Sequence, residues 1–330
     1  KWRPSPITSP AIAIAWTSFR AIVTSWSGAG ILALLTLMTI PVVLDQMDWG
    51  GASLIPATML VVRELTGPLS SELSRWLIIP LLIIFLAGEL VSPAPSRTIC
   101  RNSAAMPGAE GAPLRGKVHG LTFVLALPTA LMTLAGITAQ TILGYQRYEL
   151  ALYLKVMFGL QLSDYLLFAV VALLVHVAAN QKYAGHLLAI LIYTFMALPQ
   201  MFGVEHNLLV FGAGPAWSYT EMRGFGTSLA PWGWFKAYWA AWALVLMIAA
   251  RLLWVRGRET HLRPRLRIAR QRFRNSARIA LAASLALVAA LGGFVFYNTN
   301  ILNAHVSRTD RGQRQAEYGR PYARYADPPQ

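Results

Sequence analysis

The sequence predicts an all-α polytopic membrane protein, with about seven transmembrane helices behind an N-terminal interfacial amphipathic helix. The first observation is composition: of 330 residues, 55% are hydrophobic and 13% are charged, whereas a soluble domain usually carries about 25% charged residues. The second is that long uncharged runs alternate with short polar stretches, and a helix needs about 20 apolar residues to cross a bilayer. An open strand would leave its backbone groups unpaired in lipid, and the alternating pattern of a barrel is missing. These observations exclude a disordered protein and disfavour an ordinary soluble enzyme.

Seven apolar runs account for the predicted spans. Tryptophans flank the run at 235–255, as expected where aromatic rings meet the surface of a bilayer. The predicted spans are residues 21–44, 76–88, 120–146, 165–179, 187–201, 235–255 and 279–297.

The start of the chain predicts a helix that lies in the membrane interface. Trp16 and Phe19 fall on one helical face with other apolar residues, while Ser18 and Arg20 fall on the opposite face. The alternative is that this segment simply extends the first span.

Arginine distribution predicts how the spans are oriented. The net charge of +15 would suit a nucleic-acid binder, but ten arginines lie in one stretch, 251–278, between two apolar runs. Such a cluster is typical of a cytoplasmic loop against anionic lipid, so the expected partner is the lipid bilayer and no nucleic acid. The N-terminus is then cytoplasmic, and an odd number of spans puts the C-terminus outside. We therefore expect a cytoplasmic interfacial segment (1–26), a transmembrane domain (27–297) and an extracytoplasmic linker (298–330).

Motifs for catalysis are weak. Residues 111–118 match a phosphate-binding P-loop except that Val118 replaces the hydroxyl residue, and a span follows in place of a soluble helix, so we interpret them as a flexible basic loop. Cys100 is alone, and no His-Glu-x-x-His pattern occurs. His176 is interpreted as a neutral histidine bonded to a neighbouring helix, and Asp164 as a charge at a span end. We predict that this chain is not an enzyme and has no catalytic residue, cofactor or metal.

The segment between the fifth and sixth spans is rich in glycine and aromatic residues. Glycines permit tight turns and close backbone approach, so an ordered cap and a simple connecting loop are both open. The residues singled out here are Glu205, His206, Gly212, Gly214, Trp217 and Tyr219.

Several phrases together resemble the membrane part of bacterial type-2 ABC exporter permeases that are fused to a zinc aminopeptidase domain similar to aminopeptidase N. They are EHNLLVFGAGPAWSY at 205–219, WFKAYW at 234–239, WVRGRE at 254–259, FYNTNILN at 296–303 and RQAEY at 314–318. The resemblance covers most of the chain and is strongest from about residue 185 onwards. The zinc and catalytic motifs of the peptidase are absent from this chain, and we expect it to be a piece of a longer polypeptide.

The resemblance implies a multi-pass protein of the bacterial inner membrane that forms an export pathway with a second permease half. A separate ATP-binding subunit would drive it from the cytoplasmic side. The contacts expected with that subunit are Trp16, Phe19, Arg20, Arg97 and Arg101.

The alternative is a membrane anchor or scaffold for an extracytoplasmic zinc aminopeptidase domain, without transport. It is favoured by the scarcity of polar residues in the spans, since a pathway needs polar cavity-lining faces. Those available are Thr133, Thr138, Gln140, His176, Thr194 and Gln200.

One segment departs from the family pattern. Where the family has a charged helix that presses on the ATPase, residues 92–116 are rich in proline and alanine, and prolines disfavour a continuous helix. The hypotheses are a degenerated loop or a local reading-frame slip.

Overall fold

The computed structural model describes residues 16, 19–20, 23–49, 52–53, 55–91, 112–254, 262–303 and 308–321. Their regular secondary structure is helical except for one pair of two-residue strands, and turns and loops join the helices. The strands are β1 (Asp48–Trp49) and β2 (Ala52–Ser53), which pair antiparallel. The helices are α2 (Trp26–Gln46), α3 (Thr58–Leu65), α4 (Ile78–Val91), α6 (Ala112–Ile142), α7 (Leu150–Tyr153), the π-helix η1 (Leu154–Gln161), α8 (Leu162–Ala179), α9 (Lys182–Ala197), the 3-10 helix η2 (Pro199–Phe202), α10 (Leu229–Leu253), α11 (Leu262–Arg272), α12 (Asn275–Phe296), the π-helix η3 (Tyr297–Leu302) and α13 (Arg308–Gly319).

Five of these helical stretches are long and apolar enough to cross a membrane. They are Gly28–Gln46, Val118–Ile142, Leu150–Ala179, Leu229–Leu253 and Asn275–Leu302. The other two predicted spans are also apolar helices, α4 with 14 residues and α9 with 16. At 1.5 Å per residue they are about 21 and 24 Å long, which is less than the roughly 30 Å of a hydrocarbon core. An all-helical fold of the membrane type is therefore confirmed, and the described residues contain five helices long enough to cross a bilayer, so seven spans are not confirmed.

The fourth predicted span begins far earlier than expected. The charges of Lys155 and Asp164 suggested a start at residue 165, but α7, η1 and α8 form one continuous stretch of 30 residues from Leu150 to Ala179. Lys155 is exposed, so its long side chain can extend towards the membrane surface. Asp164 therefore lies midway along an apolar helix, and its assignment to a span end was wrong.

The P-loop-like segment and its surroundings are also helical. Residues from Ala112 onwards form the first turns of α6, so the part of 111–118 that the structure describes is helix and not the flexible loop expected. The loop between strand and helix that a P-loop requires is therefore not formed by the described residues 112–118. Residues 92–111 lie outside the described part of the chain.

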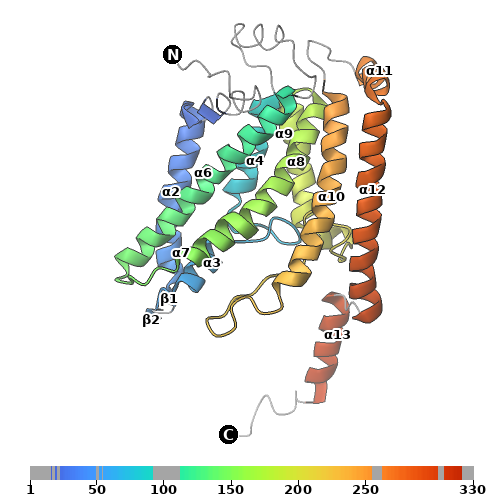
Figure 1. Cartoon of the computed structure of the whole chain (residues 1–330). Helices are drawn as coiled ribbons and strands as arrows, with labels where there is room; N and C mark the ends of the chain where they lie inside the picture. The colour runs from blue at the N-terminus through green and yellow to red at the C-terminus, as the bar shows by residue number, and fades with distance from the viewer. Residues whose placement is uncertain are drawn as a thin grey trace.

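The helices run up and down across the molecule, and α8 lies at the centre, where it contacts α4, α6, α9 and α10 (Figure 1). Helix α2 packs on α6, and α12 packs chiefly on α10. We call the end that carries β1, β2 and α3 the loop end, and the end that carries α11 the arginine end. Helix α13 lies beyond the loop end (Figure 1).

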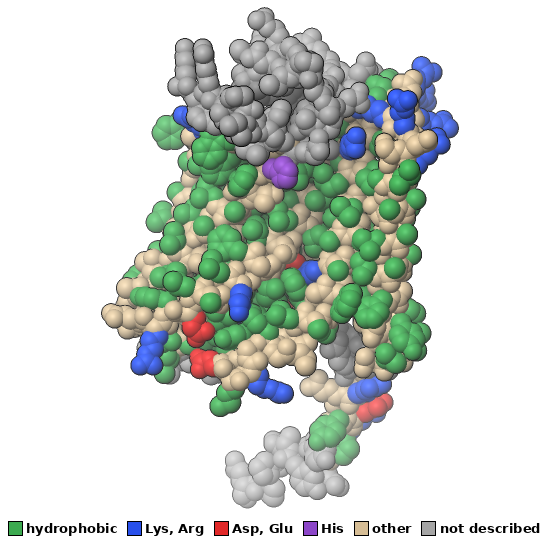
Figure 2. All heavy atoms as spheres, viewed as in Figure 1, with side chains coloured by type: hydrophobic (Ala, Val, Ile, Leu, Met, Phe, Trp, Pro, Cys, Tyr) green, Lys and Arg blue, Asp and Glu red, His purple; other side chains and the backbone are tan. Residues whose placement is uncertain are grey.

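Hydrophobic side chains cover much of the middle of the bundle, while most of the visible Lys and Arg side chains lie towards its ends (Figure 2). The distribution matches a bilayer surrounding the bundle, with charged groups at its two surfaces. A membrane location is therefore supported by both the helices and the surface.

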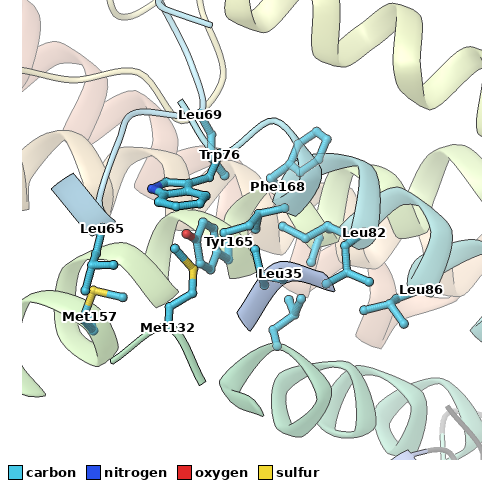
Figure 3. Packing of buried hydrophobic residues seen from close by; sticks show 14 of the residues in the cluster. Leu35, Leu65, Leu69, Trp76, Leu82, Leu86, Met132, Met157, Tyr165 and Phe168 are labelled. Carbon is cyan, nitrogen blue, oxygen red and sulfur yellow. The ribbon is translucent and has the colours of Figure 1, made fainter. Parts of the chain in front are cut away.

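The core joins α3 and the segment after it to the spans (Figure 3). Leu65 and Trp76 are buried with Met157 and Tyr165, and the indole Nε1 of Trp76 donates a hydrogen bond of 2.9 Å to the Glu64 carbonyl. Helices in lipid associate through close packing and hydrogen bonds, because lipid tails are as apolar as the side chains. This packing holds α3 firmly between α2, α6 and α7.

Candidate functional site

At the loop end, hydrogen bonds from the spans hold two non-helical segments in place. The first of these segments surrounds α3. Gln140 Nε2 donates to the Pro56 carbonyl at 2.7 Å, and its Oε1 accepts the Tyr153 hydroxyl at 2.8 Å. Gln161 Nε2 donates to the Gly67 carbonyl at 3.0 Å, and the Gly67 N–H donates back to Gln161 Oε1 at 3.4 Å. These amide side chains satisfy non-helical backbone at both ends of α3, which a buried segment in a membrane protein requires.

The second fixed segment runs from η2 to the start of α10. The Gly212 and Ala213 carbonyls accept Lys236 Nζ and Trp239 Nε1, each at 2.7 Å. Gly212 has φ +77°, which favours glycine. A Cβ on Gly214 would lie 3.1 Å from the Phe235 Cβ, so glycine allows the segment to lie directly on α10.

An ion pair joins this segment to the middle of the bundle. Lys236 Nζ lies 2.5 Å from Asp164 Oδ1, and the two side chains are 12% and 17% exposed. The Lys236 ammonium also lies 5.6 Å from the centre of the Trp232 ring, a favourable position for a cation. Charges within a membrane are costly unless paired and are candidates for function. We therefore define the candidate functional site as Asp164, Lys236 and the Gly212 carbonyl.

Sequence reasoning missed Lys236 as a site residue, because it came at the edge of an apolar run. A signal was present, because Asp164 and Lys236 each lie among mostly apolar residues. Two opposite charges in apolar runs are expected to find each other, since each alone would be expensive.

The six loop residues singled out from the sequence lie in this second segment, but they do not converge on one pocket. His206 Nδ1 accepts the Leu208 N–H at 3.1 Å, so its Nε2–H faces Asn300 Oδ1, at 3.3 Å. Glu205 beside it is half-buried.

Farther along, Trp217 and Tyr219 both pack against Phe225. Their rings lie 6.0 and 5.0 Å from that of Phe225. The Tyr219 hydroxyl donates to Glu149 Oε2 at 3.4 Å. Loss of solvent raises the pKa of Tyr219, and the negative charge of Glu149 acts in the same direction. The segment is thus tied to α10, to α12 through η3, and to the start of α7.

At the arginine end, one arginine joins two spans. The guanidinium of Arg265 in α11 is buried, and it donates to the carbonyls of Val177 at 2.5 Å, Ala178 at 3.1 Å and Leu253 at 2.8 Å. These carbonyls end α8 and α10, where helices leave acceptors unpaired and favour positive charge. Burial lowers the pKa of Arg265. Arg265 therefore faces protein, which corrects the expectation that the whole arginine stretch lies against lipid.

Two histidines meet between α4, α8 and α9. His176 Nδ1 donates to the Ala172 carbonyl at 2.8 Å, so Nε2 accepts from His186 Nδ1 at 3.1 Å. Gly185 makes room, because a Cβ there would lie 2.7 Å from His176 Cδ2. His176 is thus bonded to a neighbouring helix, as interpreted from the sequence. Within the described residues, no group of three or more His, Cys, Asp or Glu side chains is arranged to hold a metal.

The expected ATPase contacts are described only in part. Trp16, Phe19 and Arg20 are helical, the Trp16 and Phe19 rings stack with centroids 5.6 Å apart, and Phe19 packs against the core. Trp16 and Arg20 are exposed. Arg97 and Arg101 lie outside the described residues.

No family model matches this chain, and no curated protein matches it.

Proposed function

We propose that this chain is the membrane half of a bacterial ABC-type exporter permease, with a pathway formed against a second half and driven by a separate ATPase. It resides in the inner membrane with its N-terminus and α11 on the cytoplasmic side and its loop end and C-terminus outside. Helices α4 and α9 complete a set of seven spans.

The observation that carries this proposal is that distant phrases resembling the permease family contact one another. From 205–219, His206 reaches Asn300 in the phrase 296–303, and the Gly212 and Ala213 carbonyls accept side chains of the phrase 234–239. Their contact supports the interpretation that these phrases form one structural unit at the loop end. In the proposed orientation, this unit faces the extracytoplasmic side.

The short helices α4 and α9 fit a seven-span arrangement because buried non-helical segments extend them at the loop end. They pack against each other and against α8, and their loop-end sides continue into the two fixed segments. The Ser71 N–H donates to the Met196 carbonyl at 2.7 Å, and Gln200 Nε2 donates to the Ser71 carbonyl at 2.8 Å. Non-helical backbone is tolerated at membrane depth where it is buried in protein, so these segments complete the crossing.

The polar span residues support a pathway between halves rather than within this chain. Thr133, Thr138 and Thr194 each donate to the carbonyl four residues earlier, at 2.8 to 2.9 Å. The other three bond to Pro56, His186 and Ser71. Because each of the six already forms a hydrogen bond within the chain, we propose that the pathway also uses polar groups of the second half.

The test is purification of the full chain from native membranes in mild detergent, with an ATPase assay and mass identification of its companions. We expect a co-purifying ATP-binding subunit and ATP hydrolysis. Phe19→Ala should reduce that hydrolysis several-fold, because it loosens the N-terminal helix from the core. Met222→Ala is the matched control, since Met222 is 99% exposed at the loop end. Purification of an intact chain without ATPase activity would reject the permease.

The second candidate is an anchor for an extracytoplasmic peptidase domain. The internal bonding of the polar span residues favours it equally, as does α13, which leaves the bundle at the loop end (Figure 1). The two candidates differ in the same experiment, because an anchor needs no ATP-binding companion.

A further inference from the structure

A basic hollow lies where α11 turns into α12. It has a volume of 680 Å³, and three of its lining residues are arginines. The lining residues are Arg270, Gln271, Phe273, Arg274, Asn275, Ser276 and Arg278. Several Lys and Arg side chains gather at the corner of the molecule where α11 meets α12 (Figure 2).

The arginines of the hollow have no acidic neighbour along their own helices. The sequence from 262 to 303 contains neither Asp nor Glu, and within the described residues no ion pair includes Arg270, Arg274 or Arg278. The Arg278 guanidinium lies 5.6 Å from the Phe273 ring, and its Nε donates to the Phe273 carbonyl at 3.2 Å. Among the described residues, the positive charge in the hollow therefore has no acidic partner, and Arg278 is held in place.

The two faces of α11 have different roles. Arg265 and Arg272 turn towards the bundle, where they donate to carbonyls that end α8 and α10. Arg270 of α11 and Arg274, the N-cap residue of α12, are exposed instead. The start of α12 adds to the attraction for anions, because no side chain caps its first N–H groups.

An apolar face begins directly beneath the hollow. Ile279 is 69% exposed, and Leu285, which is 43% exposed, lies on the same side of α12 as Arg278. Only 11% of the most apolar part of Asn275–Leu302, the stretch formed by α12 and η3, is buried within this chain. A ligand that matches this surface has a phosphate group at the hollow and hydrocarbon chains along the apolar face of α12.

We propose that the hollow binds the phosphate of an anionic phospholipid, whose acyl chains lie along the exposed face of α12. Guanidinium groups pair with phosphate through two parallel hydrogen bonds. This site requires α12 in a bilayer and does not depend on transport.

The experiment is native mass spectrometry of the purified full chain with equal amounts of phosphatidylglycerol and phosphatidylcholine. The wild type should retain phosphatidylglycerol preferentially. Each arginine near a lipid surface contributes about fivefold, so R270Q/R274Q should weaken this binding roughly 30-fold and R270Q/R274Q/R278Q on the order of 100-fold. The charge-matched control is R251Q/R263Q, since both arginines are exposed at the same end without lining the hollow.

Three results would overturn the site. They are equal retention of the two lipids by the wild type, equal losses in R270Q/R274Q and R251Q/R263Q, and displacement of the lipid by millimolar inorganic phosphate. The second would mean diffuse attraction by the whole arginine stretch, and the third an anion site without a lipid. Tryptophan fluorescence of each variant, unchanged from the wild type, shows that the losses do not come from unfolding.

Discussion

The carboxylate of Asp164, midway along Leu150–Ala179, pairs with the ammonium of Lys236 at 2.5 Å. Lys236 also donates to the Gly212 carbonyl. One lysine therefore connects α8, α10 and the segment folded over them. Removal of either charge would leave the other one buried and unpaired.

Asp164→Asn and Lys236→Met should each lower the free energy of unfolding by about 3–5 kcal/mol, because each leaves one uncompensated charge. D164N/K236M should recover most of that loss, since it leaves neither. SDS titration followed by tryptophan fluorescence measures all three variants. Lys155→Met is the control and should change stability by less than about 0.5 kcal/mol, because Lys155 is exposed. Additive losses in the double variant would contradict a direct pair.

The close approach of Gly212 and Gly214 to α10 gives a second prediction. Gly212→Ala is strained at φ +77°, and Gly214→Ala presses on Phe235. Each should cost about 1–2 kcal/mol in the same titration. Gly233→Ala is the control, because a Cβ there meets nothing within 4 Å and α10 gains a better helix former. If Gly233→Ala costs as much as the other two, the segment does not lie on α10 as described.

Apolar runs predicted where the helices lie, because a span has little besides hydrophobicity to specify it. The start of α7 was missed since Lys155 and Asp164 break the run, and their cost is removed only by exposure and by Lys236. His206 and the loop glycines were singled out from composition, but their partners Asn300 and Phe235 could not be inferred. Such pairings depend on how distant helices pack, which no local pattern encodes.

The buried guanidinium of Arg265 leads to a third prediction. Arg265→Gln removes charged hydrogen bonds to the carbonyls that end α8 and α10, so we expect a loss of about 2–4 kcal/mol. Hydrogen exchange should rise selectively at those two helix ends. Arg267→Gln, an exposed neighbour on α11, should leave both stability and exchange unchanged. Equal effects of the two substitutions would mean that α11 acts only through its overall charge.

A substitution at Gly185 tests the contact between His176 and His186, because it changes the packing around the His176 ring. A Cβ at this position would press on the His176 ring, and overpacking in a core typically costs about 1–3 kcal/mol. Gly185→Ala should therefore be destabilising, whereas Gly159→Ala in η1 should not, because the space around Gly159 is open. Thermal unfolding in detergent compares the two. A neutral Gly185→Ala would show that the histidines can separate freely.

The orientation of the bundle can be tested with single cysteines, since Cys100 is the only native one. In a Cys100→Ser background, we expect Met222→Cys at the loop end to react with a membrane-impermeant maleimide in cells whose outer membrane is permeable. Gln271→Cys, exposed at the arginine end, should react only after the inner membrane is opened, because arginine clusters stay in the cytoplasm. Met222 lies in a turn and Gln271 near the end of α11, and both side chains are exposed, so neither substitution disturbs packing. Labelling of Gln271→Cys in intact inner membranes would reverse the orientation, and labelling of both would mean that the bundle does not separate two compartments.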